Sequence, residues 1–570
     1  MTREAALYNT WKTRLVSDRA FSAELAAIEG DEQEIRDRFY TDLTFGTAGL
    51  RGVLGLGSNR MNIFTVRRAT QGLAMYLLDT YESPSAAIAY DSRIQSDEFA
   101  RETACVFAAN GIAVHLYQEL MPTPALSYAV RELGCQTGVV ITASHNPAKY
   151  NGYKAYDPTG CQIGPEVAEV VLKNISALDY FEGIRCMDFD KGLRDGVIRY
   201  IPESFVQRYI DRVCAESLNP GVSERAGLKL VYTPLNGAGR RCVLEVLERQ
   251  GVKDIVVVPE QAEPDGRFPT CPYPNPEMRE ALKLGLALCE KTGADLLLAT
   301  DPDADRVAVA ARDGGEYRII TGNEAGVLLL DYIASTRKKL GTMPARPVAV
   351  KSIVSSKLAD AVAAEHGVEI LNVLTGFKFI GEAIAALEQK GEQDRFLLGF
   401  EESCGYLSGG YVRDKDAVDA SLLLVEMASA YKLEGKSLFD VLRDIYGRHG
   451  IYRNAVDSFS FEGADGMAKM ADIMRALRRN PPADIAGSKV VYRADYHTSA
   501  RWENGMETAI PLPSSNVLEY GLADGCAVIV RPSGTEPKIK IYYSLVGKSQ
   551  QEVATLAAGY KTACEALVGV

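Results

Sequence analysis

The chain has 570 residues and a mass of 62.0 kDa, which is too long for one hydrophobic core, and at about 100–200 residues per domain we expect four domains. Hydrophobic residues make up 47% and charged residues 24% of the sequence, so the composition excludes a largely disordered protein. The formal net charge of -12 repels nucleic acid and anionic membranes, and we expect neither as a partner.

The first eighteen residues are charged and lack the apolar core of a signal peptide, and no stretch approaches the roughly 18 apolar residues of a membrane span. The sequence therefore predicts a cytoplasmic protein. Its 11 cysteines include no close pair of the CxxC kind, which favours reduced thiols over disulfides or a zinc site. Nothing in the sequence indicates a protein partner.

In chain order, the apolar spacing from Val66 to Leu78 predicts an amphipathic helix. Short apolar runs at 86–90, 112–117 and 138–142 predict strands, and helix-like segments such as 96–111 separate them. This alternation is typical of βαβ units, so the first domain is predicted to be α/β.

The same pattern returns at 295–299 and 396–400, and each of these predicted strands is followed by a polar loop. Ligands of α/β sheets gather beyond the carboxyl ends of strands, so the loops of three α/β modules are expected to face one cleft. The last hundred or so residues predict a smaller α+β domain. The expected domain bounds are 1–205, 206–320, 321–450 and 451–570.

Two motifs follow predicted strands directly. ITASHNPAKYNGYK (141–154) places Ser144 at a strand end beside His145, which suits an activated nucleophile, although the tetrapeptide alone also suits a simple turn. DPDADR (301–306) crowds Asp301, Asp303 and Asp305 together, and hard oxygen ligands of this kind favour Mg2+ over a solvated acidic turn. The loop lacks the glycine and terminal glutamate of an EF-hand.

Two further motifs carry binding chemistry. Glu401 and Ser403 stand two residues apart and suit adjacent sugar hydroxyls, although such a pair is also common at helix N-termini. RPSGTEPKIK (531–540) gathers arginine, lysine, hydroxyl and glycine in an acidic protein, which favours a phosphate cradle over a basic hairpin.

Together and in this order, the four motifs resemble the α-D-phosphohexomutase superfamily, the phosphoglucomutases and phosphomannomutases. FGTAGLRG (45–52), YDSR (90–93), TGNE (321–324) and TGFKFIG (375–381) are also similar to that family, above all to its long bacterial glucomutase branch. The resemblance implies three similar α/β domains with mixed sheets and a smaller α+β C-terminal domain around a central cleft. It implies a Mg2+-dependent mutase that moves a phosphoryl group between the hydroxyls of a hexose.

The same resemblance implies that the four expected domains are, in chain order, a catalytic phosphoserine domain, a metal-binding domain, a sugar-binding domain and a phosphate-binding domain. It also assigns roles to residues of this chain. It makes Ser144 the phosphoserine and a metal ligand with Asp301, Asp303 and Asp305, and it places Arg51 and Lys154 near the transferring phosphate. The substrate-binding residues that it implies are Glu401, Ser403, Lys378, Arg531, Ser533, Gly534, Thr535 and Lys538. Glucose 1,6-bisphosphate is implied as the intermediate and activator.

One position departs from the family pattern. Some members carry a histidine general base just after the Glu-x-Ser stretch, whereas Cys404, Gly405 and Tyr406 follow Ser403 here. The base is then either Lys415 or His145. Among enzymes, a mannose or pentose phosphomutase is the alternative to a glucose enzyme. A sugar-phosphate sensor without catalysis is the alternative of another class, and a serine hydrolase is disfavoured because no GxSxG elbow is present.

Overall fold

The computed structural model describes residues 2–46, 49–461, 465–533 and 538–569. The chain forms two compact units, each built from several segments. The first unit comprises Met1–Ile320, Gly381–Gln393 and Cys404–Glu434. The second comprises Thr321–Ile380, Asp394–Ser403 and Gly435–Val570.

The first unit begins with three helices that pack around Trp11. Trp11 is buried and its ring meets those of Phe39 and Phe64 edge-on, with centroids 5.8 and 5.4 Å away. Such edge-to-face contacts add to the burial of large apolar surfaces. The helices are α1 (Arg3–Arg14), α2 (Arg19–Ala27) and α3 (Glu32–Phe39).

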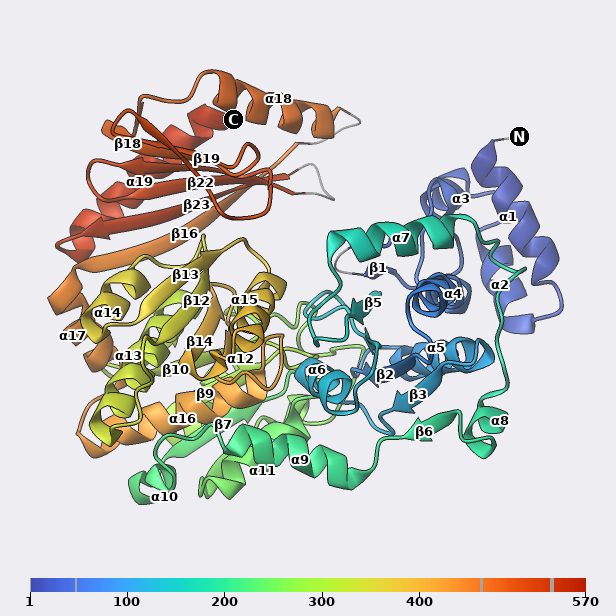
Figure 1. Ribbon diagram of the computed structural model, residues 1–570, viewed down its shortest axis with the longest axis horizontal. Helices are drawn as coiled ribbons and strands as arrows, with labels where there is room; N and C mark the ends of the chain where they lie inside the picture. Colours follow the sequence, from blue (N-terminus) through green and yellow to red (C-terminus); the bar gives the residue numbers. More distant parts are fainter. Residues whose placement is uncertain (1, 47–48, 462–464, 534–537, 570) are drawn as a thin grey trace. The chain divides into compact units, whose positions relative to one another are not determined.

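A six-stranded mixed sheet follows, in the order β1-β5-β4-β2-β3-β6. Its central strands β2 and β4 are parallel and almost wholly buried, which explains their uninterrupted apolar runs. Helices α4, α5 and α7 pack on the sheet in one core and are labelled in Figure 1. The strands are β1 (Leu50–Val53), β2 (Ser85–Tyr90), β3 (Ala113–Leu116), β4 (Thr137–Ile141), β5 (Tyr150–Tyr156) and β6 (Ile198–Tyr200). The helices are α4 (Ile63–Thr80), α5 (Ser96–Ala109), α6 (Thr123–Glu132), α7 (Pro165–Ser176) and α8 (Phe189–Arg194).

A second mixed sheet has the order β11-β10-β9-β7-β8, in which β7, β8 and β9 are parallel and β10 and β11 turn back antiparallel. The loop between β9 and β10 is the DPDADR segment, so the three aspartates follow a buried strand as predicted. The strands are β7 (Lys229–Thr233), β8 (Asp254–Val257), β9 (Leu296–Thr300), β10 (Val307–Asp313) and β11 (Glu316–Ile320). The remaining elements of the unit are α9 (Glu203–Cys214), α10 (Val222–Ala226), α11 (Arg240–Arg249), α12 (Lys283–Thr292), β15 (Gly405–Leu407) and α16 (Ala417–Leu433).

The second unit contains a parallel sheet in which β12 lies between β13 and β14. Strand β14 is fully buried and ends at Glu401, as the apolar run at 396–400 predicts. Helix α13 begins with a capping box between Thr321 and Glu324, which satisfies the first free amides of the helix. The elements are α13 (Gly322–Leu340), β12 (Val348–Ser352), α14 (Leu358–His366), β13 (Glu369–Val373), α15 (Phe377–Gln389), β14 (Phe396–Glu401) and α17 (Leu438–His449). Helix α15 is shared between the two units.

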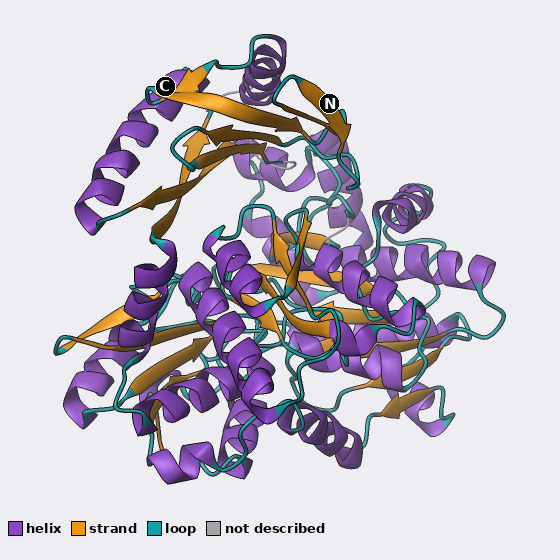
Figure 2. Ribbon diagram, turned by 60° about the vertical axis from the view of Figure 1, so that its left-hand side comes forward, coloured by secondary structure: helices purple, strands orange, loops and turns teal. Residues whose placement is uncertain are grey.

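The C-terminal part of the second unit is an antiparallel sheet in the order β16-β23-β22-β21-β18-β19-β20, with β17 paired to β18. Helices α18 and α19 pack on one face of it in a shared core. Figure 2 shows this sheet as the orange strands near the label C, with purple helices beside it. The strands are β16 (Ile451–Ser460), β17 (Asp484–Ile485), β18 (Ser488–Asp495), β19 (Ala500–Glu503), β20 (Met506–Ala509), β21 (Leu518–Leu522), β22 (Ala527–Pro532) and β23 (Lys538–Gly547). The helices are α18 (Gly466–Arg479) and α19 (Gln550–Val568).

The predicted fold class is confirmed, because three α/β sheet systems precede a sheet-rich C-terminal domain. All 11 cysteines are unpaired thiols, and nine of them are buried as small core residues. Among the described helices, none combines the length and apolarity that crossing a bilayer requires. The predicted domain boundaries and the central cleft stay predictions.

Candidate active site

Ser144 lies in the loop after β4 with a backbone φ of 51°, in the left-handed region that non-glycine residues seldom occupy. The residue is 4% exposed, and its amide donates to Thr142 Oγ1 at 2.8 Å. Backbone strain of this kind persists only where the surroundings hold it, and it is concentrated at functional sites. The loop therefore presents Ser144 in a fixed orientation.

Arg93 holds this loop through hydrogen bonds to its backbone. Its guanidinium donates to the backbone carbonyls of Ser144 and Asn146, and to those of Pro147 and Tyr150 at 3.0 and 2.9 Å. Asp91 lies 3.5 Å from Arg93 Nε. The sequence resemblance included the YDSR segment but gave its arginine no role. The position of Arg93 in the loop just after β2 was the sequence feature that could have indicated one.

Removing this arginine is expected to destabilise the first unit. Arg93→Met leaves the buried Asp91 without its cation and four carbonyls without their donor, at a cost of about 3–5 kcal/mol. We expect scanning calorimetry to show a lowered unfolding transition, while the matched change Arg101→Met on the exposed face of α5 leaves that transition in place. An unaltered transition in Arg93→Met would contradict this role.

Ser144 Oγ donates to Asp301 Oδ2 at 2.9 Å, which joins two motifs 157 residues apart. The carboxylates of Asp301, Asp303 and Asp305 are 0, 0 and 2% exposed, and each offers an oxygen within 4.8 Å of the others. Burial raises the pKa of Asp301 well above its usual range, and the other two carboxylates add to this rise. A nearby cation would relieve that repulsion.

The donor set fits a divalent cation. Asp303 Oδ1 and Asp305 Oδ1 are buried and have no hydrogen-bond partner among the described residues. Asp303 Oδ2 is held by Thr123 Oγ1 at 2.9 Å and by Lys154 Nζ at 2.8 Å. Hard carboxylate oxygens that are left without donors in a dry site are what Mg2+ requires. The Thr123 contact was missed from the sequence, because a threonine near a helix start carries no signature of a metal site.

The two lysines are ion-paired with this cluster. Lys154 Nζ lies 3.4 Å and Lys415 Nζ 3.3 Å from Asp305 Oδ2, and Lys415 Nζ lies 3.1 Å from Asp414 Oδ1. Burial alone would lower the pKa of Lys154, but Asp303 and Asp305 outweigh it and raise that pKa. Both amino groups therefore lie at the aspartate cluster, to which Ser144 also bonds through Asp301.

His145 and Arg51 are the remaining predicted site residues of the first unit. His145 Nδ1 lies 3.1 Å from Ser144 Oγ, and Arg51 Nη1 lies 3.3 Å from Asn146 Oδ1 in the same loop. Burial lowers the pKa of His145 to about 2, and the nearby Arg306 and Arg51 charges act in the same direction. The imidazole is therefore neutral at physiological pH.

The second unit holds the predicted sugar-binding loop. Glu401 Oε1 accepts the backbone N–H of Gly376 at 2.7 Å, which ties the Glu-x-Ser loop to the TGFKFIG segment. Ser403 is half-buried in that loop. Lys378 Nζ lies 4.8 Å from the centroid of the Phe379 ring. The two segments named from the sequence are thus joined.

The predicted phosphate cradle lies in the same unit. Arg531 of β22 is opposite Lys540 of β23, and the amide of Ser533 donates to the carbonyl of Lys538 at 2.8 Å. Gly534 and Thr535 lie outside the described residues. Burial raises the pKa of the Tyr542 phenol, the Glu402 charge adds to that rise and the Arg531 guanidinium opposes it. Tyr542 therefore lies near both Arg531 of the cradle and Glu402 of the Glu-x-Ser loop, and it was not identified from the sequence.

The described geometry can be compared with known proteins. Residues 42–181, 207–315 and 321–449 match the three domains described as phosphoglucomutase/phosphomannomutase alpha/beta/alpha domains I, II and III. A phosphoglucomutase of Staphylococcus saprophyticus is 38% identical over 525 residues, covering 92% of this chain and 94% of that protein. The chain belongs to the phosphoglucomutase/phosphomannomutase family. A phosphoglucomutase of Staphylococcus aureus is also 38% identical, over 91% of this chain and 93% of its own length.

Two solved structures of the family share the fold. The putative phosphomannomutase of Thermus thermophilus has a TM-score of 0.68 at 23% identity and covers 93% of this chain and 100% of its own. Parafusin of Paramecium, a phosphoglucomutase in its open form, has a TM-score of 0.68 at 17% identity and covers 93% of this chain and 95% of its own. These two structures show the shared fold, whereas the three domain matches and the relatives at 38% identity confirm the family membership that the motifs predict.

Proposed function

We propose that this chain is a phosphoglucomutase that interconverts glucose 1-phosphate and glucose 6-phosphate in the cytoplasm, through phosphorylated Ser144 and a glucose 1,6-bisphosphate intermediate. The observation that carries the proposal is the hydrogen bond from Ser144 Oγ to a buried group of three aspartates. Two of these have an oxygen that accepts from no donor among the described residues. The naming of relatives at 38% identity supports glucose as the sugar.

In the first half-reaction, the free hydroxyl oxygen of the bound hexose phosphate attacks phosphorus on phosphoserine 144. The bond from phosphorus to Ser144 Oγ breaks, a new bond to the sugar oxygen forms, and the hydroxyl proton passes to a base. The bisphosphate then turns end for end and returns its other phosphoryl group to Ser144. Rate in such transfers comes mainly from positioning and charge stabilisation, which Lys154, Lys415 and Arg51 would supply.

Asp301, Asp303 and Asp305, with an oxygen on Ser144, would hold Mg2+. When bound, the ion would neutralise charge on the phosphoryl oxygens. Glu401 and Ser403 would bind sugar hydroxyls. Arg531, with Ser533, Gly534, Thr535 and Lys538, would bind the phosphate that is not being transferred, and Lys378 would contribute charge near the substrate.

The sugar is tested by comparison of turnover. The purified protein with Mg2+ is given glucose 1-phosphate, mannose 1-phosphate or ribose 1-phosphate, each with a trace of the matching bisphosphate, and kcat/KM is compared. We expect glucose 1-phosphate to give the highest value. A higher value for mannose or ribose would replace the proposal with a mannose or pentose mutase, and no turnover of any of the three would favour a sensor.

The general base is proposed to be Lys415 or His145, and Lys415 is tested first. Lys415→Met is expected to lower kcat by about 10²- to 10⁴-fold, the range of a lost acid–base group. Lys432→Met is the matched control. Lys432 lies on α16, is half-exposed, and likewise pairs with an aspartate, with its Nζ 2.8 Å from Asp295 Oδ2.

The pH dependence of kcat separates a base from an electrostatic contact. If Lys415 is the base, Lys415→Met removes a limb of the pH–rate profile, which neutralising a spectator charge would not do. If kcat of Lys415→Met falls no more than kcat of Lys432→Met, His145 becomes the proposed base. His145→Gln would then be measured in the same way.

Loss of Arg531 is expected to weaken substrate binding in both reaction directions. Arg531→Ala removes a charge-assisted contact worth about 1.5–3 kcal/mol, so kcat/KM falls about ten- to a hundredfold with either glucose phosphate. Phosphoserine content, measured by intact mass, should persist because the first unit is unchanged. Arg479→Ala, a change of an exposed residue at the end of α18, is the control. A defect in one direction only, with unchanged affinity, would mean that Arg531 serves another phosphate.

A further inference from the structure

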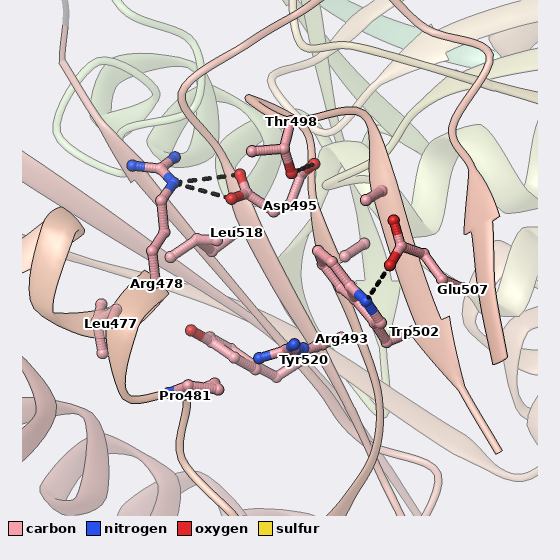
Figure 3. A pocket seen from close by; sticks show the side chains of 12 residues that line it. Leu477, Arg478, Pro481, Arg493, Asp495, Thr498, Trp502, Glu507, Leu518 and Tyr520 are labelled. Atoms are coloured by element: carbon pink, nitrogen blue, oxygen red, sulfur yellow. Dashed lines mark hydrogen bonds and ion pairs between the residues drawn. The ribbon is translucent and has the colours of Figure 1, made fainter. Parts of the chain in front are cut away.

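A cavity of about 360 Å³ lies in the C-terminal domain, between the end of α18 and the strands β18 to β21 (Figure 3). Leu477 and Pro481 line it from the helix side, and Leu518 lines it from the sheet. Its volume lies in the lower part of the range of small-molecule sites, which are mostly apolar with a few placed polar groups. The family site residues are not among those that line it.

The strand pairing explains which polar groups face this cavity. Arg493 is directly opposite Tyr520 on one side and Trp502 on the other, and Trp502 is opposite Glu507. Directly paired residues of neighbouring strands point to the same face of a sheet. Four strands therefore carry a continuous row of Tyr520, Arg493, Trp502 and Glu507 along one wall of the cavity.

The two arginines of the cavity differ in their contacts. Arg478 is engaged, because its Nε lies 3.0 Å from Asp495 Oδ2 and its Nη2 donates to Asn516 Oδ1 at 2.6 Å. Arg493 is stacked instead, with its guanidinium carbon 4.3 Å from the centroid of the Trp502 ring. Within the described residues its guanidinium has neither an ion pair nor a hydrogen bond. Stacking fixes the guanidinium plane and leaves its donor edge for an acceptor.

A second donor of the cavity wall is without an acceptor. Tyr520 is 1% exposed, and its hydroxyl has no hydrogen-bond partner within the part of the chain that the structure describes. Burial raises the pKa of this phenol, and the Asp495 charge adds to that rise, so the hydroxyl keeps its proton. A buried donor of this kind is costly unless a ligand or water accepts from it.

The acids of the cavity are already satisfied. Glu507 Oε2 accepts from Trp502 Nε1 at 2.9 Å, and Asp495 is held by Arg478. The groups that lack partners among the described residues are therefore a fixed guanidinium and a neutral phenol, beside an apolar wall. This combination selects an acceptor with negative charge attached to an apolar body.

We propose that this cavity is a binding site for a small organic carboxylate. The carboxylate would accept from Arg493 and from the Tyr520 hydroxyl, and its apolar body would pack on Leu477, Pro481 and Leu518. The site is separate from the phosphate cradle: Val528 of β22 is opposite Tyr520 and shares its face, whereas Arg531, three residues further along the strand, points to the other face.

The test is a calorimetric titration of the full chain with benzoate and with 3-phenylpropionate, in the absence of sugar phosphate. We expect saturable binding of at least one of them and at least about tenfold weaker binding of the neutral amides benzamide and 3-phenylpropionamide. Trp502 and Trp11 are the two tryptophans of the chain, so a change of tryptophan emission that is lost in Trp502→Phe would place the ligand at this cavity.

Variants give the decisive comparison. Arg493→Gln is expected to weaken carboxylate binding by at least about tenfold and Tyr520→Phe by about tenfold, whereas Arg475→Gln, an exposed change on α18, leaves it unaltered. Mutase activity should be unchanged in all three, so this result is independent of the proposed function. Tyr520→Phe keeps the buried ring and removes only the hydroxyl. It therefore still tests the site if Arg493→Gln fails to fold. The proposal is overturned if neither carboxylate binds below about 10 mM, if the amides bind equally well, or if the folded variants bind as the wild type does.

Discussion

Ser144→Ala is expected to abolish mutase activity while the protein stays folded and still binds Mg2+. The change removes only the oxygen that would carry the phosphoryl group, and the loop keeps its shape because Arg93 and Thr142 hold backbone atoms rather than the serine side chain. Asp301 loses one hydrogen bond but keeps the amides of Asp305 and Arg306, at 3.1 and 3.0 Å. The aspartate cluster should therefore persist.

The measurement pairs turnover with labelling. Wild-type protein incubated with radioactive glucose 1,6-bisphosphate should retain label on Ser144, and Ser144→Ala should retain none. Ser176→Ala is the control, because Ser176 lies exposed on α7 of the same sheet system and its hydroxyl donates to the carbonyl of Leu172 in the same helix. Turnover near the wild-type level in Ser144→Ala would remove Ser144 from the mechanism.

Local pattern was enough to predict the elements that carry the site. The apolar runs before Ser144 and Asp301 became β4 and β9 because strands buried on both faces have no polar positions to interrupt the pattern. The run before Glu401 became β14 for the same reason. The polar loops at these strand ends were therefore predictable as loops, and their chemistry could be inferred from residue type.

Contacts between distant segments were not predictable in the same way. The local sequence pattern does not predict the distance between Ser144 and Asp301, because that distance depends on how two sheets of the first unit pack. Thr123 acts through one aspartate, which leaves no residue pattern to find. The place of Arg93 after a strand was visible in the sequence, but its bonds to the carbonyls of the Ser144 loop were not. Tyr542 has the pattern of an ordinary strand aromatic, and only its neighbours Glu402 and Arg531 distinguish it.

The same limit applies to the general base. His145 and Lys415 were both candidates because each is a basic residue near a motif, but their environments differ in ways that only the structure describes. His145 is held neutral by burial and nearby arginines, whereas Lys415 lies against two carboxylates. Protonation states depend on such surroundings, so residue identity alone could not rank the two.

Removal of the divalent metal is expected to stop turnover completely and reversibly. Three carboxylates with oxygens within 4.8 Å of one another repel, and two of their oxygens have no hydrogen-bond donor in the described residues. Activity should fall to background in excess chelator and return when Mg2+ is restored. Full activity in excess chelator would contradict a metal role for this cluster.

Asp303→Asn is expected to weaken Mg2+ binding by more than about a hundredfold, and to reduce turnover at limiting Mg2+ accordingly. The amide keeps the size of the side chain and an acceptor for Lys154 and Thr123, but it removes one negative charge from the loop. Lys154 keeps its contact with Asp305 at 3.4 Å, so the protein should still fold. The affinity is measured by calorimetric titration of the metal-free protein, and Asp295→Asn, which alters an ion pair with Lys432 just before β9, is the matched control. Equal Mg2+ affinity in the two variants would show that the charge of Asp303 does not hold the metal.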